Sequence, residues 1–350
     1  MPKRSKKHHE TKTKTHATAH MRYASTYIVD WHEDWSRQTF PVDTRVRLGR
    51  AAWALVTYDG PAILNGAVPA RRAYVDLFAA AALHRRGRFV LIADPTWEPG
   101  SRRLDRLLGA RHEQPGRDAP PITRPALQRA VVSLVDGPSV HYAVLSHYET
   151  ESLAEVWGLD RGRIHFVPFC ATRNEAEVGA GGGGVFAGGN SLRDYRALAE
   201  AAGSIHGPVT IATSIEAPAA TAARFAHMSA ADYEAAALAA DVVVVPLMSG
   251  TTRSAGQQTY LNAMLRGQAV VVTQAPGVDD YLVHGQTGLV VGNDPSDLAG
   301  AINALLADRA LRARLGAAAR AAVLAQFRRR DYYDRLLNLA SRLSGSVTDD

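Results

Sequence analysis

The chain has 350 residues, of which 46% are hydrophobic, and carries a formal net charge of +6. This length accommodates two domains with sizeable cores, and the composition is that of an ordinary globular protein. The single cysteine, Cys170, excludes an internal disulfide, and no apolar run reaches the length of a membrane span. The chain starts with polar residues and shows no secretory signal, so we expect a cytoplasmic protein.

Most of the positive charge belongs to the first twenty residues. Residues 1–20 hold six Lys or Arg against one Glu, so the rest of the chain is close to neutral. A nucleic-acid-binding domain would carry its charge on the folded body, so we expect no nucleic-acid partner. We expect residues 1–20 to be disordered. This tail is either a solubilising segment or an electrostatic tether to the inner face of a membrane.

Residues 21–168 alternate between short apolar strands and helical segments, which is typical of an α/β domain with a parallel sheet. Strands are expected at 27–29, 53–57, 89–93, 140–145 and 164–167. Helices are expected at 69–86, 104–108, 127–135 and 152–159, with a loop at 114–125.

A glycine-rich segment follows this first half. Residues 179–184 are Gly except for Ala180, a composition that gives a flexible backbone. We therefore expect residues 169–184 to link two domains, with the glycine run acting as a hinge.

Residues 185–326 repeat the alternation of strand and helix. Strands are expected at 185–187, 209–212, 242–245 and 269–272. Helices are expected at 194–202, 231–240, 258–265, 297–306 and 311–326, with a further helix at 332–343. The pattern predicts a doubly wound parallel sheet, in which ligands bind beyond the carboxyl ends of the strands.

A motif with a defined spacing lies in the second half. Asn262, Ala263 and Met264 are followed by Gly267, then by a strand, a loop at 277–280 and a Gly-x-x-Gly turn at 285–288. This stretch resembles the donor half of retaining family-4 (group 1) glycosyltransferases of the GT-B fold. The family pattern has two Glu separated by seven residues, and a third acidic residue in the later loop. Ser254 and Asn262 occupy the two Glu positions here, and Asp280 occupies the third.

The resemblance implies a GT-B fold of two Rossmann-like domains that face a central cleft. Residues 21–168 would form the acceptor side, residues 185–326 would bind the donor, and residues 327–350 would return to the first domain. The implied activity is sugar transfer from a nucleotide-diphospho-sugar to an unidentified acceptor, as a step of carbohydrate biosynthesis, with retention of configuration and without a metal or another cofactor. The acceptor would be a glycan, a lipid-linked intermediate or a small molecule. Because two family carboxylates are missing, a non-catalytic sugar-nucleotide-binding module and a nucleotide-sugar epimerase remain alternatives.

The first candidate site is the turn that opens the second half. Gly188 and Gly189 allow backbone N–H groups to approach an oxyanion at a helix start. Arg193 can bind a diphosphate, and it matches the Lys of the family turn. Asn190 lies close to the position that an Arg occupies in the family turn. A tight turn without a ligand is the alternative.

The loop before residue 258 is the second candidate site. Its small residues and backbone N–H groups suit contact with a donor sugar and phosphate, and Arg253 would add a second cation. The other expected donor-binding residues of this loop are Ser254, Ala255, Gly256 and Gln257. A solvated surface loop is the alternative.

Later positions complete the predicted donor site. By resemblance, Asn262 binds the ribose, where an amide can accept one hydrogen bond and donate another. Gly277, Asp279 and Asp280 lie on the loop after the strand at 269–272, and Asp280 matches the acidic residue near the sugar hydroxyls. A helix cap is the alternative for the two aspartates.

The first half offers fewer candidates. Asp94 ends a strand at the ligand-binding edge of its sheet and is the expected catalytic group of this domain. His32 and His147 also follow predicted strands and could meet an acceptor, although a structural or solvated role is the alternative for both.

Overall fold

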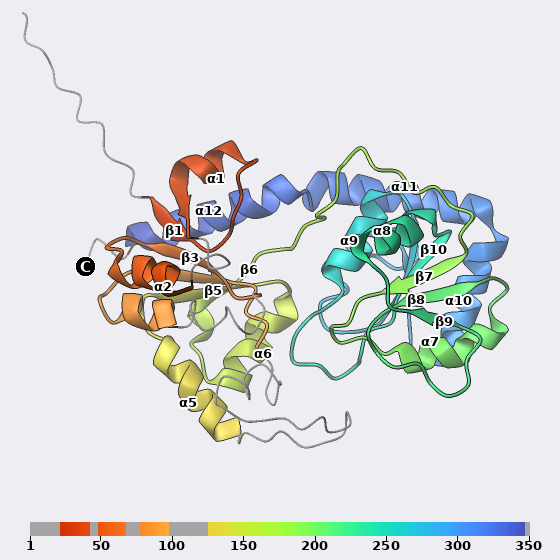
Figure 1. The fold of residues 1–350 in the computed structure, drawn as a ribbon, viewed down its shortest axis with the longest axis horizontal. Coiled ribbons are helices and arrows are strands. Elements are labelled where there is room, and N and C mark those ends of the chain that lie inside the picture. Colours follow the sequence, from red (N-terminus) through yellow and green to blue (C-terminus); the bar gives the residue numbers. More distant parts are fainter. Residues whose placement is uncertain (1–21, 43–47, 68–77, 98–124, 347–350) are drawn as a thin grey trace, which may run out of the picture.

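The computed structural model describes residues 22–42, 48–67, 78–97 and 125–346. These residues form two α/β units that lie side by side (Figure 1). Each unit contains one six-stranded sheet in which every pair of neighbouring strands is parallel. The predicted architecture of two doubly wound parallel sheets is therefore confirmed.

The first unit has the strand order β2-β1-β3-β4-β5-β6. Along β4, Val90 and Ile92 point to one core, and Leu91 and Ala93 point to the other, so helices cover both faces of the sheet. The strands are β1 (Tyr23–Ser25), β2 (Thr39–Pro41), β3 (Ala62–Asn65), β4 (Val90–Ala93), β5 (Val140–Val144) and β6 (Ile164–Phe166). The helices are α1 (Glu33–Gln38), α2 (Leu48–Thr57), α5 (Pro125–Val135) and α6 (His147–Trp157), with a short 3-10 helix at Arg161–Arg163.

The start of this unit differs from the sequence prediction. The first strand lies at Tyr23–Ser25 and not at 27–29, and the predicted strand at 53–57 is the end of helix α2. In that helix Leu55 is fully buried whereas Trp53 is 71% exposed, so the apolar run lies across two helix faces. A short apolar run does not separate strand from buried helix. Strands β2 and β3 were not predicted.

The remaining elements of the first unit agree better with the prediction from the sequence. Strands β4, β5 and β6 and helix α5 are confirmed, and residues 78–84 of the predicted helix 69–86 are helical. Helix α6 begins five residues before its predicted start, because the Ser146 side chain accepts the Glu149 N–H and caps it. The predictions at 1–20, 104–108 and 114–124 lie outside the described residues.

The second unit has the strand order β12-β11-β10-β7-β8-β9. Val243 and Val245 of β10 face one core, and Val242 and Val244 face the other. The strands are β7 (Val185–Gly188), β8 (Val209–Ala212), β9 (Arg224–Ala226), β10 (Val242–Val245), β11 (Ala269–Thr273) and β12 (Leu289–Val291). The helices are α7 (Tyr195–Ala201), α8 (Ala230–Ala239), α9 (Gln257–Leu265), α10 (Pro295–Ala307) and α11 (Arg309–Gln326), with a 3-10 turn at Ala202–Ser204. All predicted elements of this unit are present, whereas β9 and β12 were missed.

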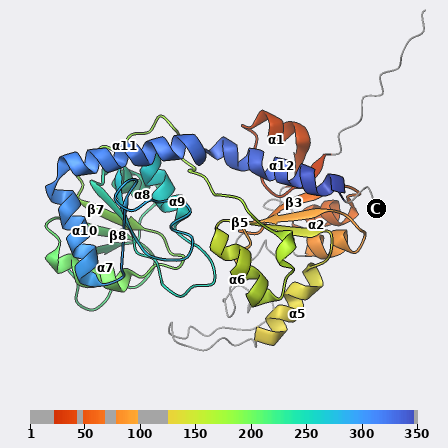
Figure 2. The ribbon, with the colours of Figure 1, turned by 180° about the vertical axis from the view of Figure 1, so that it is seen from behind.

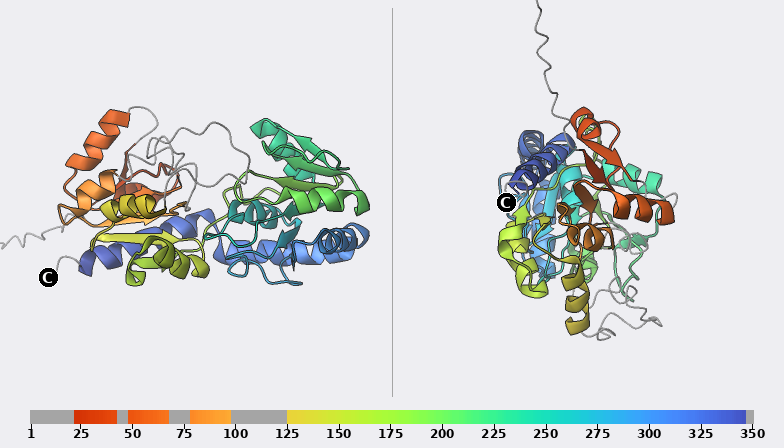
Figure 3. Two further views of the ribbon diagram at one scale, coloured as in Figure 1. Left: turned by 90° about the horizontal axis from the view of Figure 1, so that it is seen from below. Right: turned by 90° about the vertical axis from the view of Figure 1, so that its left-hand side faces the viewer.

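Helix α12 (Arg329–Ser346) joins the two units. It follows α11 and crosses from the second unit to the first, as Figures 2 and 3 show from two further sides. Tyr332, Leu336 and Ala340 pack in the same core as Leu91 of β4. The predicted helix at 332–343 therefore lies against the first unit. Within the described part of the chain, no helix is long and apolar enough to cross a membrane.

The glycine run does not lie freely between the units. Gly179, Ala180 and Gly183 donate backbone hydrogen bonds to Arg266, Leu238 and Ala239, all in the second unit. Bending at 179–184 would break these bonds, so the structure does not support a hinge there. The domain boundaries themselves stay a prediction.

Candidate active site

A cleft of about 740 Å³ lies between the two units. Asp94 and Leu145 line it from the first unit, beyond the carboxyl ends of β4 and β5. Loops that follow β7 and β10 line it from the second unit. The cleft thus lies at the edge of the sheets where ligands bind in doubly wound folds.

The turn after β7 places a buried cation in this cleft. Gly189 has a φ of +108°, and a Cβ there would come within 3.1 Å of Arg193 Nη2, so the turn requires glycine. Arg193 is 5% exposed and donates to Gly188 O at 3.3 Å, Ser191 O at 2.8 Å and Thr259 Oγ1 at 3.0 Å. Its guanidinium has five N–H donors, so two remain for a ligand.

Arg193 has no acidic partner among the described residues. Burial lowers the pKa of Arg193, and the side chains around it are the tyrosines Tyr195, Tyr233 and Tyr260. An unpaired buried charge is costly to the folded protein. The part of the cleft around Arg193 therefore favours the binding of an anion.

The helix that presents its N–H groups to the cleft is α9. The expected helix, α7, is capped by its own Asp194, whose carboxylate accepts the Arg196 N–H. In α9 the N-cap is Gly256, with a φ of +89° and no side chain to cap the first turn. Residues 256–259 line the cleft, so this helix start can meet an anion. The helix start that lines the cleft is therefore that of α9 and not that of α7, for which it was predicted.

The loop before α9 lines the cleft as predicted from Arg253 to Gln257. Arg253 Nη2 donates to Ser191 Oγ at 2.8 Å and so joins this loop to the turn after β7. The Ser254 hydroxyl is turned away from solvent, and it bonds the carboxylate of Glu149 in the first unit at 2.8 Å.

Two amides at the cleft are already engaged. Asn262 Oδ1 accepts the N–H of Thr172 at 2.7 Å, and its Nδ2 donates to Thr172 Oγ1 at 3.1 Å. Thr172 Oγ1 also lies 3.4 Å from Oδ1, so one amide N–H of Asn262 remains for the ribose predicted there. Asn190 Oδ1 accepts from Thr213 and Ser214, so it holds the loop after β8.

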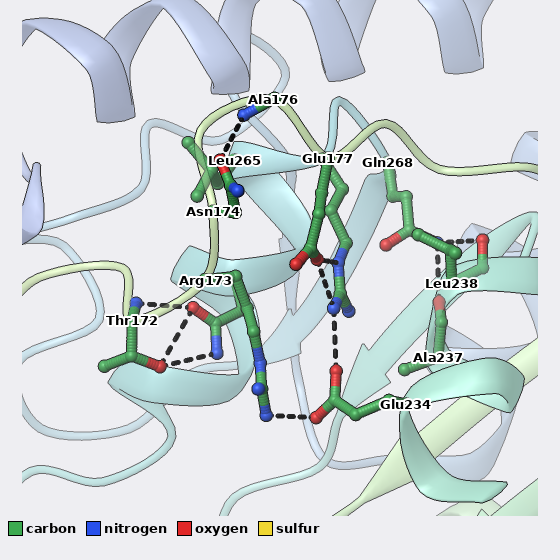
Figure 4. Close-up of polar contacts among 12 residues, drawn as sticks. Thr172, Arg173, Asn174, Ala176, Glu177, Glu234, Ala237, Leu238, Leu265 and Gln268 are labelled. Carbon is green, nitrogen blue, oxygen red and sulfur yellow. Dashed lines mark hydrogen bonds and ion pairs between the residues drawn. The ribbon is translucent and has the colours of Figure 1, made fainter. Parts of the chain in front are cut away.

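A group of charged residues that the sequence did not reveal connects residues 173–177 to the second unit (Figure 4), and Arg173, Glu234 and Arg266 of this group line the cleft. Glu234 of α8 pairs with Arg173, and it lies 2.7 Å from Nη2 of the buried Arg266. Glu177 lies 2.7 Å from the same Nη2 atom. These ion pairs fix residues 173–177 onto the second unit. No local spacing could have indicated them, because the partners are 32 to 89 positions apart.

Three predicted donor-binding residues do not line the cleft. Asp280 accepts from the N–H and from Nδ1 of His147, at 2.9 and 2.6 Å, and so contacts the start of α6. Asp279 accepts from Gln274. Gly277 lies against the first unit, where a Cβ would be 2.5 Å from Ser146 Cβ. Asp280 and Gly277 thus contact the first unit, Asp279 stays within the second, and the donor contact of all three stays a prediction.

Among the first-unit candidates, Asp94 lines the cleft and His32 does not. Asp94 has a φ of +55°, a left-handed backbone that Asp tolerates, at the end of β4. His32 is buried: its Nδ1 accepts the Trp35 N–H as the cap of α1, and its Nε2 lies 3.1 Å from Asp334 Oδ1. His32, Asp34 and Asp334 are close enough together to bind a metal ion, although Nδ1 of His32 is already used as the cap of α1.

Glu149 is the functional candidate that the sequence reading missed. It lies in the first turn of α6, and its side chain is buried at the contact with Ser254. The pKa of Glu149 is raised from 4.5 to about 7, chiefly by burial and in part by the nearby charge of Asp94, against the hydrogen bond from Ser254, which lowers it. Its neighbour Ser254 is 105 positions away, so no local pattern in the sequence could indicate this contact.

Two parallel-sheet units facing a cleft, with the last helix returning to the first unit, are the features of the GT-B fold. Residues 224–322 match the family described as glycosyl transferases group 1. The fold and this match indicate a glycosyltransferase, and the predicted resemblance to the group 1 type is confirmed.

Solved structures share this fold at low sequence identity. Sucrose-phosphate synthase from Thermosynechococcus elongatus is 17% identical, with a TM-score of 0.59 over 88% of this chain and 84% of that one. The Anabaena protein HepE, in complex with UDP, is 13% identical, with a TM-score of 0.58 over 87% and 85%. A glycosyltransferase from Rickettsia africae is 10% identical, with a TM-score of 0.56 over 89% and 86%. No curated protein matches the sequence.

Proposed function

We propose that this protein transfers a sugar from a nucleotide-diphospho-sugar to an acceptor, with retention of the anomeric configuration. The observation that carries the proposal is Arg193, a buried cation at the cleft with no acidic partner among the described residues. One of its N–H groups goes to Thr259, in the uncapped first turn of α9. A diphosphate would satisfy both the cation and the helix start.

Each cleft residue has a proposed task in this reaction. Arg193, Arg253 and the N–H groups at the start of α9 stabilise the departing diphosphate as its negative charge increases. Asn262 holds the ribose with the amide N–H that Thr172 leaves available. Asp94 faces the acceptor from the first unit. Catalysis then rests on positioning and on charge stabilisation, without a resident metal.

The donor is proposed to be a uridine nucleotide, because the similarly folded HepE has been solved with UDP and with UDP-glucose. The test is calorimetric titration of the protein with UDP, GDP and ADP. Binding of one of them supports the donor site. The same ligand should also raise the melting temperature of the protein, because it binds the folded state. If none binds at millimolar concentration, the donor site is not in this cleft.

A non-catalytic sugar-nucleotide-binding module is the second candidate. The observation in its favour is that a serine and an amide stand at positions 254 and 262, where the family pattern has carboxylates. Incubation with UDP-glucose and a panel of acceptors separates the two functions. Release of UDP with a glycosylated product shows transfer, whereas tight binding without consumption of the sugar shows a binding module.

The acceptor and the place of action belong to the same proposal. We propose a cytoplasmic enzyme whose basic residues 1–20 contact anionic lipid at the inner membrane face, where each basic residue contributes about 1 kcal/mol. The charge of these residues supports the contact, and vesicle sedimentation tests it.

A further inference from the structure

Helix α6 of the first unit contacts the loop of the second unit that lines the cleft. We call residues 249–257 the donor loop. Three side chains of α6 bond three residues of this loop, over less than two helical turns. The bonds are Tyr148 Oη to Thr251 O at 3.2 Å, Ser152 Oγ to Thr252 O at 2.7 Å and Ser254 Oγ to Glu149 Oε2 at 2.8 Å.

Glu149 is at the centre of this contact. Its Oε2 accepts hydrogen bonds from Leu145 N at 3.1 Å, Ser146 Oγ at 2.9 Å and Ser254 Oγ. Because the single hydroxyl hydrogen of Ser254 goes to this carboxylate, Ser254 accepts in turn from Gln257 Nε2. The bonds therefore turn the NH₂ end of the Gln257 amide towards Ser254. The carbonyl end of Gln257 is then left as an acceptor at the cleft, which Gln257 lines.

A role as a helix cap does not account for this arrangement. Ser146 and Glu149 have the spacing of a capping box, which an exposed Glu would serve as well. Glu149 is instead 7% exposed, and no cation pairs with it in the described part of the chain. Keeping an ionisable group there costs stability, because burial favours its neutral form. Such a cost is typical of a group that serves function.

We propose that Glu149 is a positioning residue of the donor site, which holds the donor loop against α6 and orients Gln257 through Ser254. Ser254 stands where the group 1 pattern has an acidic residue, and the carboxylate at this place comes from the other unit. The donor site is therefore complete only when the two units are in contact. This inference rests on the proposed function, since the loop is taken to bind a nucleotide sugar.

The test compares Glu149→Ala, Ser254→Ala, the double variant and Glu149→Gln in the full chain. The control is Glu155→Ala, an exposed acidic residue of the same helix. We expect Glu149→Ala to weaken UDP binding about tenfold in calorimetry, and Glu149→Gln, which keeps an acceptor oxygen, to lose less. The double variant should lose no more UDP affinity than the weaker-binding single variant, because both substitutions break the same hydrogen bond between Ser254 and Glu149.

A second measurement does not need a ligand. Amide hydrogen exchange of residues 249–257 should become about tenfold faster in Glu149→Ala and stay unchanged in Glu155→Ala. Unchanged exchange together with unchanged UDP affinity would overturn the inference, even if the melting temperature falls, because Glu149 would then act only as a cap. If the parent protein does not bind UDP, the proposed donor loses support, and hydrogen exchange alone decides this inference.

Discussion

Arg193 gives the sharpest prediction for the donor site. Replacing it with Ala removes the three hydrogen bonds of the guanidinium and the two N–H groups that remain for a diphosphate. A hydrogen bond to a charged group contributes about 1.5–3 kcal/mol. We therefore expect Arg193→Ala to weaken UDP binding by roughly 10- to 150-fold. Uridine, which has no phosphate, should bind almost as it does to the parent protein.

The matched control for this prediction is Arg196→Ala. Arg196 lies three positions later, is 83% exposed and pairs with Glu200 on the surface of α7. The substitution Arg196→Ala removes the same charge at a position that does not line the cleft, so the affinities for UDP and for uridine should stay unchanged. Arg193→Lys should retain part of the UDP affinity, because it keeps the charge but not the planar set of donors. Equal UDP affinities of Arg193→Ala and the parent protein would refute the placement of the diphosphate.

Three further outcomes are expected. Asn262→Ala should weaken uridine and UDP alike, by about 1 kcal/mol, and calorimetry of both ligands would contradict the ribose contact if only UDP were affected. Because the pKa of Glu149 is raised, its carboxyl group binds a proton more tightly in the folded protein than in the unfolded chain. The protonated group therefore stabilises the folded protein below about pH 4.5, and this contribution to the free energy of unfolding is lost as the pH rises to about 7. In the parent protein the free energy of unfolding should fall by about 3 kcal/mol at most over this pH window, and in Glu149→Gln the fall should be smaller. Denaturant titration of both proteins at several pH values tests this, and the same pH dependence in both would argue against a buried proton on Glu149. A chain that starts at Met21 should keep its melting temperature and lose salt-sensitive sedimentation with anionic vesicles; equal sedimentation with and without residues 1–20 would remove the membrane contact.

The second unit was predictable because its signals are local. The run of four valines in β10 is β-branched and apolar, and it fits a strand that is buried on both faces. Gly267, with a φ of +71°, ends α9 in the conformation that favours glycine. The spacing of loop, helix and strand then placed Arg253 and Asn262 at the same edge of the sheet, where the structure also has them.

The first unit was less predictable because its signals conflict. The segment that ends α2 is apolar and contains Val and Thr, so it resembles a strand over five residues. Only the preceding turns of the helix and the burial of Leu55 in the sheet core decide its conformation. Strand β3, which follows at Ala62–Asn65, has only four residues, and Gly60, Pro61 and Gly66 bound it so closely that its apolar run is too short to stand out.

Contacts between distant residues were decided only by the tertiary structure. The sequence identified an arginine four positions after a pair of glycines, but not that folding would bury Arg193 beside the start of α9. It assigned Asp280 to the donor, whereas the packing of the units places that carboxylate on His147. It showed a missing acidic residue at position 254, and the fold brings Glu149 to that place from the other unit. Periodicity and spacing report on neighbours along the chain, whereas burial, charge pairing and the contact between two units depend on which surfaces meet in space.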